Sequence, residues 1–498
     1  MPLSKSKPKK LPLLRRETIS QYRFLLKPTL ILAAVYLLGI FAIVRSNFYY
    51  IDDIARASTG YTEWEYYSRH IMVLFAYFMH GGTYLTDVSP LPQMMAAVFM
   101  ALAGTISVFA ITGKKDFSLW FLIAAVPMGL SPYFLECFSY KYDSAVMGLS
   151  VLFAVFPLLF VGASERKYTL TVLACTVCMC MSYQASAGIF PVLVVLICYR
   201  RWLDGEPLNK IIRFALVSAG GYLAGMLLFR VCIMTPITTH ASSSMPSPET
   251  FLPSVIHAYK DFLKYYLSDF KPSWHVFIVI LALCFLYASW WTAQRSRIVS
   301  FLLALPVLGA MAALSLGVYP FLETPIFNPR SMYGIGCTVA FFTIFTFSRL
   351  PKLLPARISC FLLSWCFFSF AFTYGNALYM QSQYTDYRIT VTIDDLMDSG
   401  ILDETEGKTW QITGSIGYAP AIRNMPQNYQ ILNRLVPVTF RNSSWYWGTY
   451  GFMNYYGLPY IPIDYTNDYT SMDLPVIVEN VYHTISSDGT AILIDLHP

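Results

Sequence analysis

Stretches of about 20 apolar residues recur along the chain, and each is long enough to cross the hydrocarbon core of a bilayer as a helix. We place these segments at residues 28–44, 91–111, 117–135, 144–161, 168–182, 187–198, 214–232, 274–291, 299–319, 332–347 and 358–378. Composition agrees with a membrane protein, because 56% of the 498 residues are hydrophobic and 13% are charged, against about 25% charged in soluble domains. The sequence therefore predicts an all-α polytopic membrane domain of about eleven transmembrane helices.

Basic residues gather in every second loop between these segments. They are Lys114, Lys115, Arg166, Lys167, Arg200, Arg201, Lys210, Arg213, Arg295, Arg297, Arg349, Lys352 and Arg357. Short loops rich in Lys and Arg stay in the cytoplasm, so we expect these loops and the basic residues 1–27 to be cytoplasmic. The C-terminus then lies outside. The net charge of +6 is mostly this topology signal and indicates no nucleic-acid partner.

The composition changes after residue 378, where acidic residues become common and basic ones rare. Segments 410–416 and 491–495 have the pattern of buried strands, and 392–399 and 428–435 that of helices. Aromatic residues at 445–450 and 455–456 suit either contact with sugar rings or the core of a small domain. We therefore expect three parts: a cytoplasmic N-terminus (1–27), a transmembrane domain (28–378) and a small extracytoplasmic α/β domain (379–498).

Two adjacent aspartates, Asp52 and Asp53, lie just beyond the first apolar segment, with Arg56 close behind. A carboxylate pair at a membrane exit suits chemistry at the lipid surface, although acidic residues are also ordinary in exposed loops. Adjacent residues point in different directions, so one carboxylate can react while the other holds the loop. Two adjacent carboxylates also suit a divalent cation such as Mg or Mn, and this alternative stays open.

The other outer loops hold further polar residues, namely Arg69, Lys141, Asp143, Tyr183, Gln184, Glu323 and Arg330. Asp143 also stands where a helix N-cap is expected, and Arg330 also suits a helix-end anchor that snorkels to the membrane surface. The predicted spans themselves hold almost no ionisable residue at mid-depth, where transporters usually place such groups. The pattern favours an enzyme at the outer surface over a carrier.

Three segments resemble the Gtr-type glucosyltransferases, the serotype-converting O-antigen enzymes of enteric bacteria and their phages. They are Tyr50-Ile-Asp-Asp-Ile-Ala-Arg-Ala-Ser-Thr-Gly-Tyr, Tyr-Lys-Tyr-Asp-Ser at 140–144 and Ser-Tyr-Gln-Ala-Ser at 182–186. The resemblance implies a GT-C-type fold in the bacterial inner membrane, with the C-terminal domain in the periplasm. It also implies an undecaprenyl-phosphate-glucose donor and an O-antigen or similar surface-glycan acceptor. Such an enzyme depends on a bactoprenyl glucosyltransferase and a flippase to supply its donor.

On that family pattern, Asp52 or Asp53 serves as the catalytic base, and the chemistry of the transfer suggests roles for the other residues. A base takes the proton of the acceptor hydroxyl, and cations stabilise the leaving phosphate. Arg56, Arg69, Lys141 and Arg330 are the candidates for the phosphate, with the two-pronged guanidinium favouring Arg69 and Arg330. Asp143, Tyr183, Gln184 and Glu323 are the candidates for binding substrate.

Two other kinds of function stay open on the sequence. One is a different outer-face enzyme of glycan assembly, such as a polymerase or a phosphoethanolamine or acyl transferase. The other is a transporter of a lipid-linked precursor. The scarcity of charge at mid-membrane speaks against the transporter, and an acyl transferase is expected to show a clearer His or Ser nucleophile.

Overall fold

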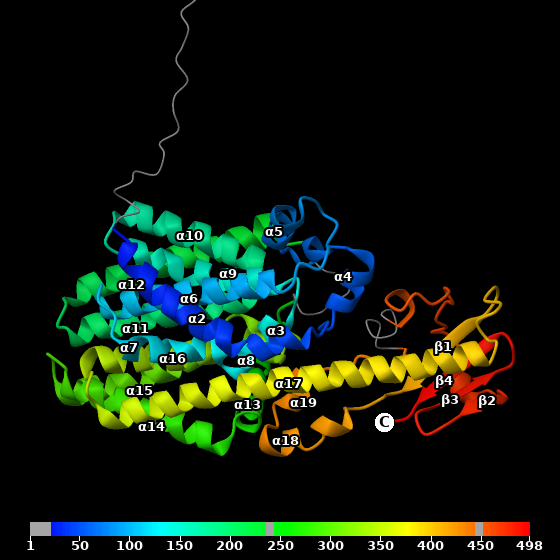
Figure 1. Cartoon of the computed structure of the whole chain (residues 1–498). Helices are drawn as coiled ribbons and strands as arrows, with labels where there is room; N and C mark the ends of the chain where they lie inside the picture. Colours follow the sequence, from blue (N-terminus) through cyan, green and yellow to red (C-terminus); the bar gives the residue numbers. More distant parts are fainter. Residues whose placement is uncertain (1–20, 236–243, 444–451) are drawn as a thin grey trace, which may run out of the picture.

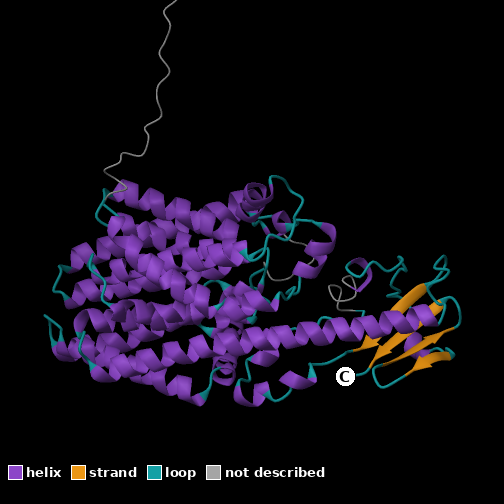
Figure 2. Ribbon diagram, viewed as in Figure 1, coloured by secondary structure: helices purple, strands orange, loops and turns teal. Residues whose placement is uncertain are grey.

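The computed structural model describes residues 21–235, 244–443 and 452–498. Most of this chain is helical, and a small sheet lies near the C-terminus (Figures 1 and 2). The basic residues of segment 1–20, predicted to be cytoplasmic, and the aromatic residues at 445–450 lie outside the described residues.

Every apolar segment predicted from the sequence contains a helix. In chain order these are α2 (Leu26–Gly39) with α3 (Phe41–Ser46), α6 (Leu91–Thr112), α7 (Leu119–Leu130) with α8 (Pro132–Ser139), α9 (Ser144–Val155), α10 (Glu165–Ser182), α11 (Ile189–Leu203), α12 (Leu208–Leu228), α14 (Pro272–Trp291), α15 (Arg297–Leu314), α16 (Gly334–Arg349) and α17 (Leu354–Asp398). The loops between them carry α4 (Asp53–Thr59), α5 (His70–His80) and α13 (Phe251–Asp269).

The helices differ in whether their length and composition allow them to cross a membrane. In the described residues, six helices are long and apolar enough to span a bilayer, and the bent pair of α7 and α8 gives a seventh. The predicted count of about eleven is therefore not confirmed. The break in this pair is sharp: α7 and α8 meet at an angle of 59°, and Pro132 begins α8, where its missing N–H prevents a continuous helix.

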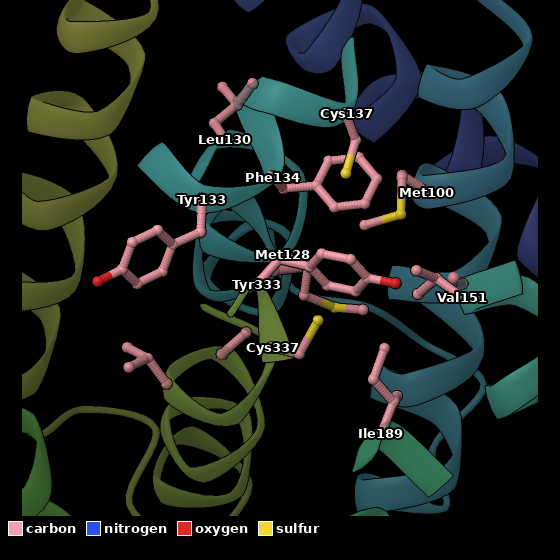
Figure 3. Packing of buried hydrophobic residues seen from close by; sticks show 14 of the residues in the cluster. Met100, Met128, Leu130, Tyr133, Phe134, Cys137, Val151, Ile189, Tyr333 and Cys337 are labelled. Carbon is pink, nitrogen blue, oxygen red and sulfur yellow. The ribbon is translucent and has the colours of Figure 1, made fainter. Parts of the chain in front are cut away.

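Three buried hydroxyl groups are linked by hydrogen bonds within the helical body. Tyr333 is fully buried, with its ring in edge contact with that of Phe134 at 5.1 Å (Figure 3). The Tyr333 hydroxyl and the Ser186 hydroxyl are 2.7 Å apart, and Ser186 is 2.7 Å from the Ser150 hydroxyl. Buried hydroxyls that satisfy one another in this way fix the register of the helices around them.

The basic loops meet at one end of the helical body. The contacts between them are Arg200 Nη1 to the Ile111 carbonyl (2.7 Å), Arg349 Nη1 to Asp204 (2.5 Å), Arg295 Nε to the Trp202 carbonyl (3.1 Å) and Arg213 Nε to Glu165 (2.5 Å). The first of the loops predicted to face outward, which carries α4 and α5, lies at the other end of the helical body (Figure 1).

Helix α17 joins the helical body to the C-terminal sheet. It has 45 residues and runs without a break from one to the other (Figure 1). Gly375 lets it touch α3, because a Cβ there would lie 2.3 Å from the Ala42 backbone. At the far end, the buried Arg388 donates to the His497 carbonyl (2.7 Å) and also to the Tyr482 carbonyl.

The sheet has the strand order β1-β4-β3-β2. Its strands are β1 (Thr409–Gly414), β2 (Val476–Glu479), β3 (His483–Ser487) and β4 (Ala491–Leu496). Strand β1 is parallel to β4, and the other pairs are antiparallel. The predicted strands at 410–416 and 491–495 are confirmed. Predicted helix 392–399 is the end of α17, and 428–435 holds only the short helices α18 (Met425–Asn428) and α19 (Leu432–Leu435).

Candidate active site

The two aspartates of the first outer loop differ in their surroundings. The loop turns sharply because Asn47 and Ile51 adopt left-handed backbone angles (φ 50° and 48°), a strained conformation for a β-branched residue such as Ile51. Asp53 is fully buried, and its Oδ2 accepts the backbone N–H of Tyr50 (3.1 Å) and of Lys141 (2.9 Å). Asp53 therefore ties the first outer loop to the second.

Asp52 is the accessible member of the pair, with its side chain 33% exposed. Partial burial raises the pKa of Asp52 above the ordinary value of 3.8, and the negative charge of Asp143 raises it further, while the positive charges of Arg56, Arg330 and Arg69 act in the opposite direction. Its Oδ2 lies 3.7 Å from Arg56 Nη1. A carboxylate with a raised pKa is a stronger base than ordinary aspartate, so Asp52 is suited to take a proton.

Arg56 and Asp143 form a buried ion pair. Arg56 Nη1 lies 2.7 Å from Asp143 Oδ2, and the side chains are 5% and 3% exposed. Trp64 Nε1 donates to the other oxygen of Asp143 at 2.8 Å. Asp143 stands at the N-cap of α9, but its side chain makes no capping hydrogen bond. Its carboxylate is instead engaged with the first outer loop.

Lys141 and Arg330 are each paired with a carboxylate as well. Lys141 Nζ donates to Asn47 (2.6 Å) and to Asp87 (2.9 Å). Arg330 Nη1 lies 2.5 Å from Glu136 Oε1, and the Arg330 backbone N–H donates to Glu136 Oε2 at 2.6 Å. The guanidinium therefore points to a buried carboxylate, which a snorkelling anchor does not do.

Glu136 is a site residue that the sequence interpretation missed. It is 2% exposed and lies in α8, within the run Phe134-Leu135-Glu136-Cys137-Phe138. A single acid inside an apolar run is the signal that points to it, because such a charge is costly unless it is paired.

Arg69 has no carboxylate partner among the described residues. Its guanidinium lies over the rings of Tyr183 (4.9 Å) and Tyr67 (5.4 Å). Tyr183 is thus brought into the cluster through Arg69. Of the other predicted substrate residues, Gln184 is half-buried beside Tyr183 and Glu323 is exposed. Among the described residues, no side-chain hydrogen bond or ion pair joins Gln184 or Glu323 to Asp52.

The site cluster, which we define as Asp52, Asp53, Arg56, Arg69, Glu136, Lys141, Asp143, Tyr183 and Arg330, combines an accessible carboxylate with several cations. Among the described residues, no group of three or more His, Cys, Asp or Glu side chains is arranged to hold a metal ion. The alternative of a divalent cation held by the adjacent carboxylates of Asp52 and Asp53 stays a prediction. Arginine and lysine side chains are the charges available to stabilise an anion at this end of the molecule.

A helical body with membrane-length apolar helices, and a carboxylate–arginine cluster at one end, defines a class of protein: a membrane protein equipped for chemistry at the membrane surface. Residues 41–341 match the family model described as Glucosyl transferase GtrII. The chain therefore belongs to the GtrII glucosyl transferase family and is a glycosyltransferase. All the residues of the cluster lie within the matched range.

A relative comes from Salmonella phage P22. It is named "Uncharacterized 55.3 kDa protein in gtrB 5'region" and is 23% identical over 431 residues, which cover 82% of this chain and 85% of the relative. No solved structure gives a significant match.

Proposed function

We propose that the protein transfers a glucosyl or similar hexosyl residue from undecaprenyl-phosphate-sugar to O-antigen or another surface glycan, at the outer face of the bacterial inner membrane. Serotype conversion follows from such a transfer, because the modified glycan is exposed on the cell. The observation that carries the proposal is the contrast between accessible Asp52, with arginines around it, and buried Asp53.

In this mechanism Asp52 is the base and Asp53 holds the loop. Asp52 takes the proton of the acceptor hydroxyl as the hydroxyl oxygen attacks the anomeric carbon. The bond between that carbon and the phosphate oxygen breaks, and the polyprenyl phosphate leaves with the bonding electrons. Arg69 is the best placed to bind this phosphate because its charge is not already paired with a carboxylate, and Arg330 adds a second positive charge.

The membrane arrangement is part of the proposal. We place residues 1–27 and the basic loops in the cytoplasm, residues 28–378 in the membrane domain with about eleven crossings, and residues 379–498 in the periplasm. The gathering of the basic loops at one end, opposite the candidate site, supports this arrangement. Reporter fusions after Pro498 test it: a cytoplasmic C-terminus contradicts both the topology and the placing of the site.

The transfer is tested in isolated membranes that contain the protein. Labelled undecaprenyl-phosphate-glucose is supplied together with lipopolysaccharide from the host strain, and label in the polysaccharide is measured. We expect transfer from the lipid-linked donor and none from UDP-glucose when synthesis of the lipid donor is blocked. Direct transfer from UDP-glucose under that condition overturns the proposed donor.

A further inference from the structure

A cavity of about 220 Å³ lies between the first outer loop, α17 and the C-terminal domain. The first outer loop contributes Asn47, Tyr49 and Ile54 to its wall, which brings the cavity within a few residues of Asp52. Helix α17 and the C-terminal domain close the other sides with residues such as Ser382 and Tyr455. The first outer loop, which carries Asp52, and the C-terminal domain therefore line the same cavity.

The lining combines aromatic rings with hydrogen-bonding groups. The rings of Tyr49 and Tyr455 are 5.4 Å apart and edge-on, and Tyr455 is in similar contact with Tyr456 at 5.1 Å. The Tyr456 hydroxyl donates to Asp386 at 2.6 Å. Tyr379 and Tyr455 are each 43% exposed, so ring surface is available to a bound molecule.

This chemistry suits a carbohydrate better than a lipid or a phosphate. A sugar ring presents C–H groups on its faces, which pack against aromatic rings, and hydroxyls at its edge, which need donors and acceptors. A lipid tail needs a wall without polar side chains, whereas Ser382, Asn47 and Asp386 all contribute here. The volume is below the ~300–1,000 Å³ of pockets for drug-sized ligands, which suits a short stretch of saccharide.

We infer that this cavity binds the acceptor glycan, holding sugar residues next to the one that is modified, so that the C-terminal domain contributes to the choice of acceptor. The inference rests on the proposed transfer to a surface glycan. The loop 47–54 contributes to the wall of the cavity and also includes Asp52, so a glycan chain bound in the cavity can continue toward Asp52.

The test uses two variants that change the cavity from opposite sides. Tyr455→Ala removes a ring, and Ser382→Trp fills the space from α17. Tyr460→Ala is the matched control, because Tyr460 is 74% exposed in the same domain and does not line the cavity. Transfer is measured in membranes against rising concentrations of lipopolysaccharide, and binding of released O-polysaccharide to the purified full-length protein is measured by ligand-observed NMR.

We expect each cavity variant to raise the acceptor KM about tenfold, as the loss of one well-placed aromatic contact does, with the donor KM unchanged. Binding of the polysaccharide should weaken in parallel, and the control should match the wild type in both. An unchanged acceptor KM and unchanged binding in both variants overturn the inference. If the wild type transfers no sugar, the proposed function fails, and the binding measurement alone decides the role of the cavity.

Discussion

The two ends of the helical body use the same charged residue types in different ways. At the end where the basic loops meet, arginines bind main-chain carbonyls or exposed carboxylates, and the Arg213–Glu165 pair is 72% and 53% exposed. At the opposite end Arg56 and Asp143 are 5% and 3% exposed. Glu136, the partner of Arg330, is buried as well.

The difference separates exposed charges, which we propose set the topology, from buried charges, which we propose take part in the chemistry. An exposed ion pair contributes about 0–1 kcal/mol and is screened by salt. Burying a charge costs several kcal/mol unless it is paired and hydrogen-bonded. Chains keep such clusters mostly where charge and pKa values are tuned for function, so we expect mutations at the two ends to have very different effects.

The largest effect is expected for Asp52→Asn. The change keeps the shape of the side chain and removes the base, so transfer should fall about 10²–10⁴-fold while the protein still inserts. Asp53→Asn is the matched comparison: its amide oxygen still accepts the two backbone N–H groups, so the loss should be smaller. Rates in isolated membranes, corrected for expression, measure both. A greater loss in the Asp53 variant reverses the assignment of the two aspartates.

The pH dependence sharpens the same assignment. A base is active when deprotonated, so kcat/KM should fall as the pH decreases through the pKa of Asp52. Because burial raises that pKa, the acidic limb should lie above the ordinary aspartate value of 3.8. A pH profile measured in membranes tests this, and an acidic limb at or below that value contradicts Asp52 as the base.

A somewhat smaller loss is expected for Arg69→Ala. Removing one charge-stabilising donor typically costs about 10²–10³-fold in rate, and Arg69→Lys should restore only part of it because lysine cannot bind phosphate with two parallel hydrogen bonds. Arg330→Ala should lower the rate similarly, but it also leaves Glu136 without its partner, so Arg69 gives the cleaner result. If Arg69→Ala transfers sugar at the wild-type rate, then Arg330 or Lys141 binds the phosphate instead.

Asp143→Ala tests the buried ion pair itself. The change removes the closer of the two carboxylates that pair with buried Arg56 and leaves only Asp52, 3.7 Å away. Breaking a buried pair typically costs about 3–5 kcal/mol of stability. Thermal unfolding of the purified protein in detergent measures the effect, and a double change of Arg56 and Asp143 to apolar residues should recover part of it. A transition as stable as the wild type shows that water or lipid headgroups replace the carboxylate.

The smallest effect is expected at the basic end, for Arg213→Ala. Its pair with Glu165 is exposed, so the stability should change by no more than about 1 kcal/mol and transfer should stay at the wild-type rate. The same detergent unfolding and membrane assay apply. A loss comparable to that of Asp143→Ala removes the distinction between the two ends.

Local pattern was enough to predict where the helices lie and which loops carry charge. Apolar segments of membrane length and strands such as β1 and β4 are encoded by neighbouring residues, and their helices and strands are present. The number of crossings was less predictable, because breaks such as the one at Pro132 depend on how each segment packs.

The sequence by itself determined the helical class, the charge alternation and the candidate residues Asp52, Asp53, Arg56, Arg69, Lys141 and Arg330. Only the tertiary structure decided which aspartate is accessible and which cations are paired. Arg330 and Glu136 are 194 positions apart, and Arg56 and Asp143 are 87 apart. Such pairings arise when distant helices pack together, and burial and charge at a site follow from that packing, which no local pattern records.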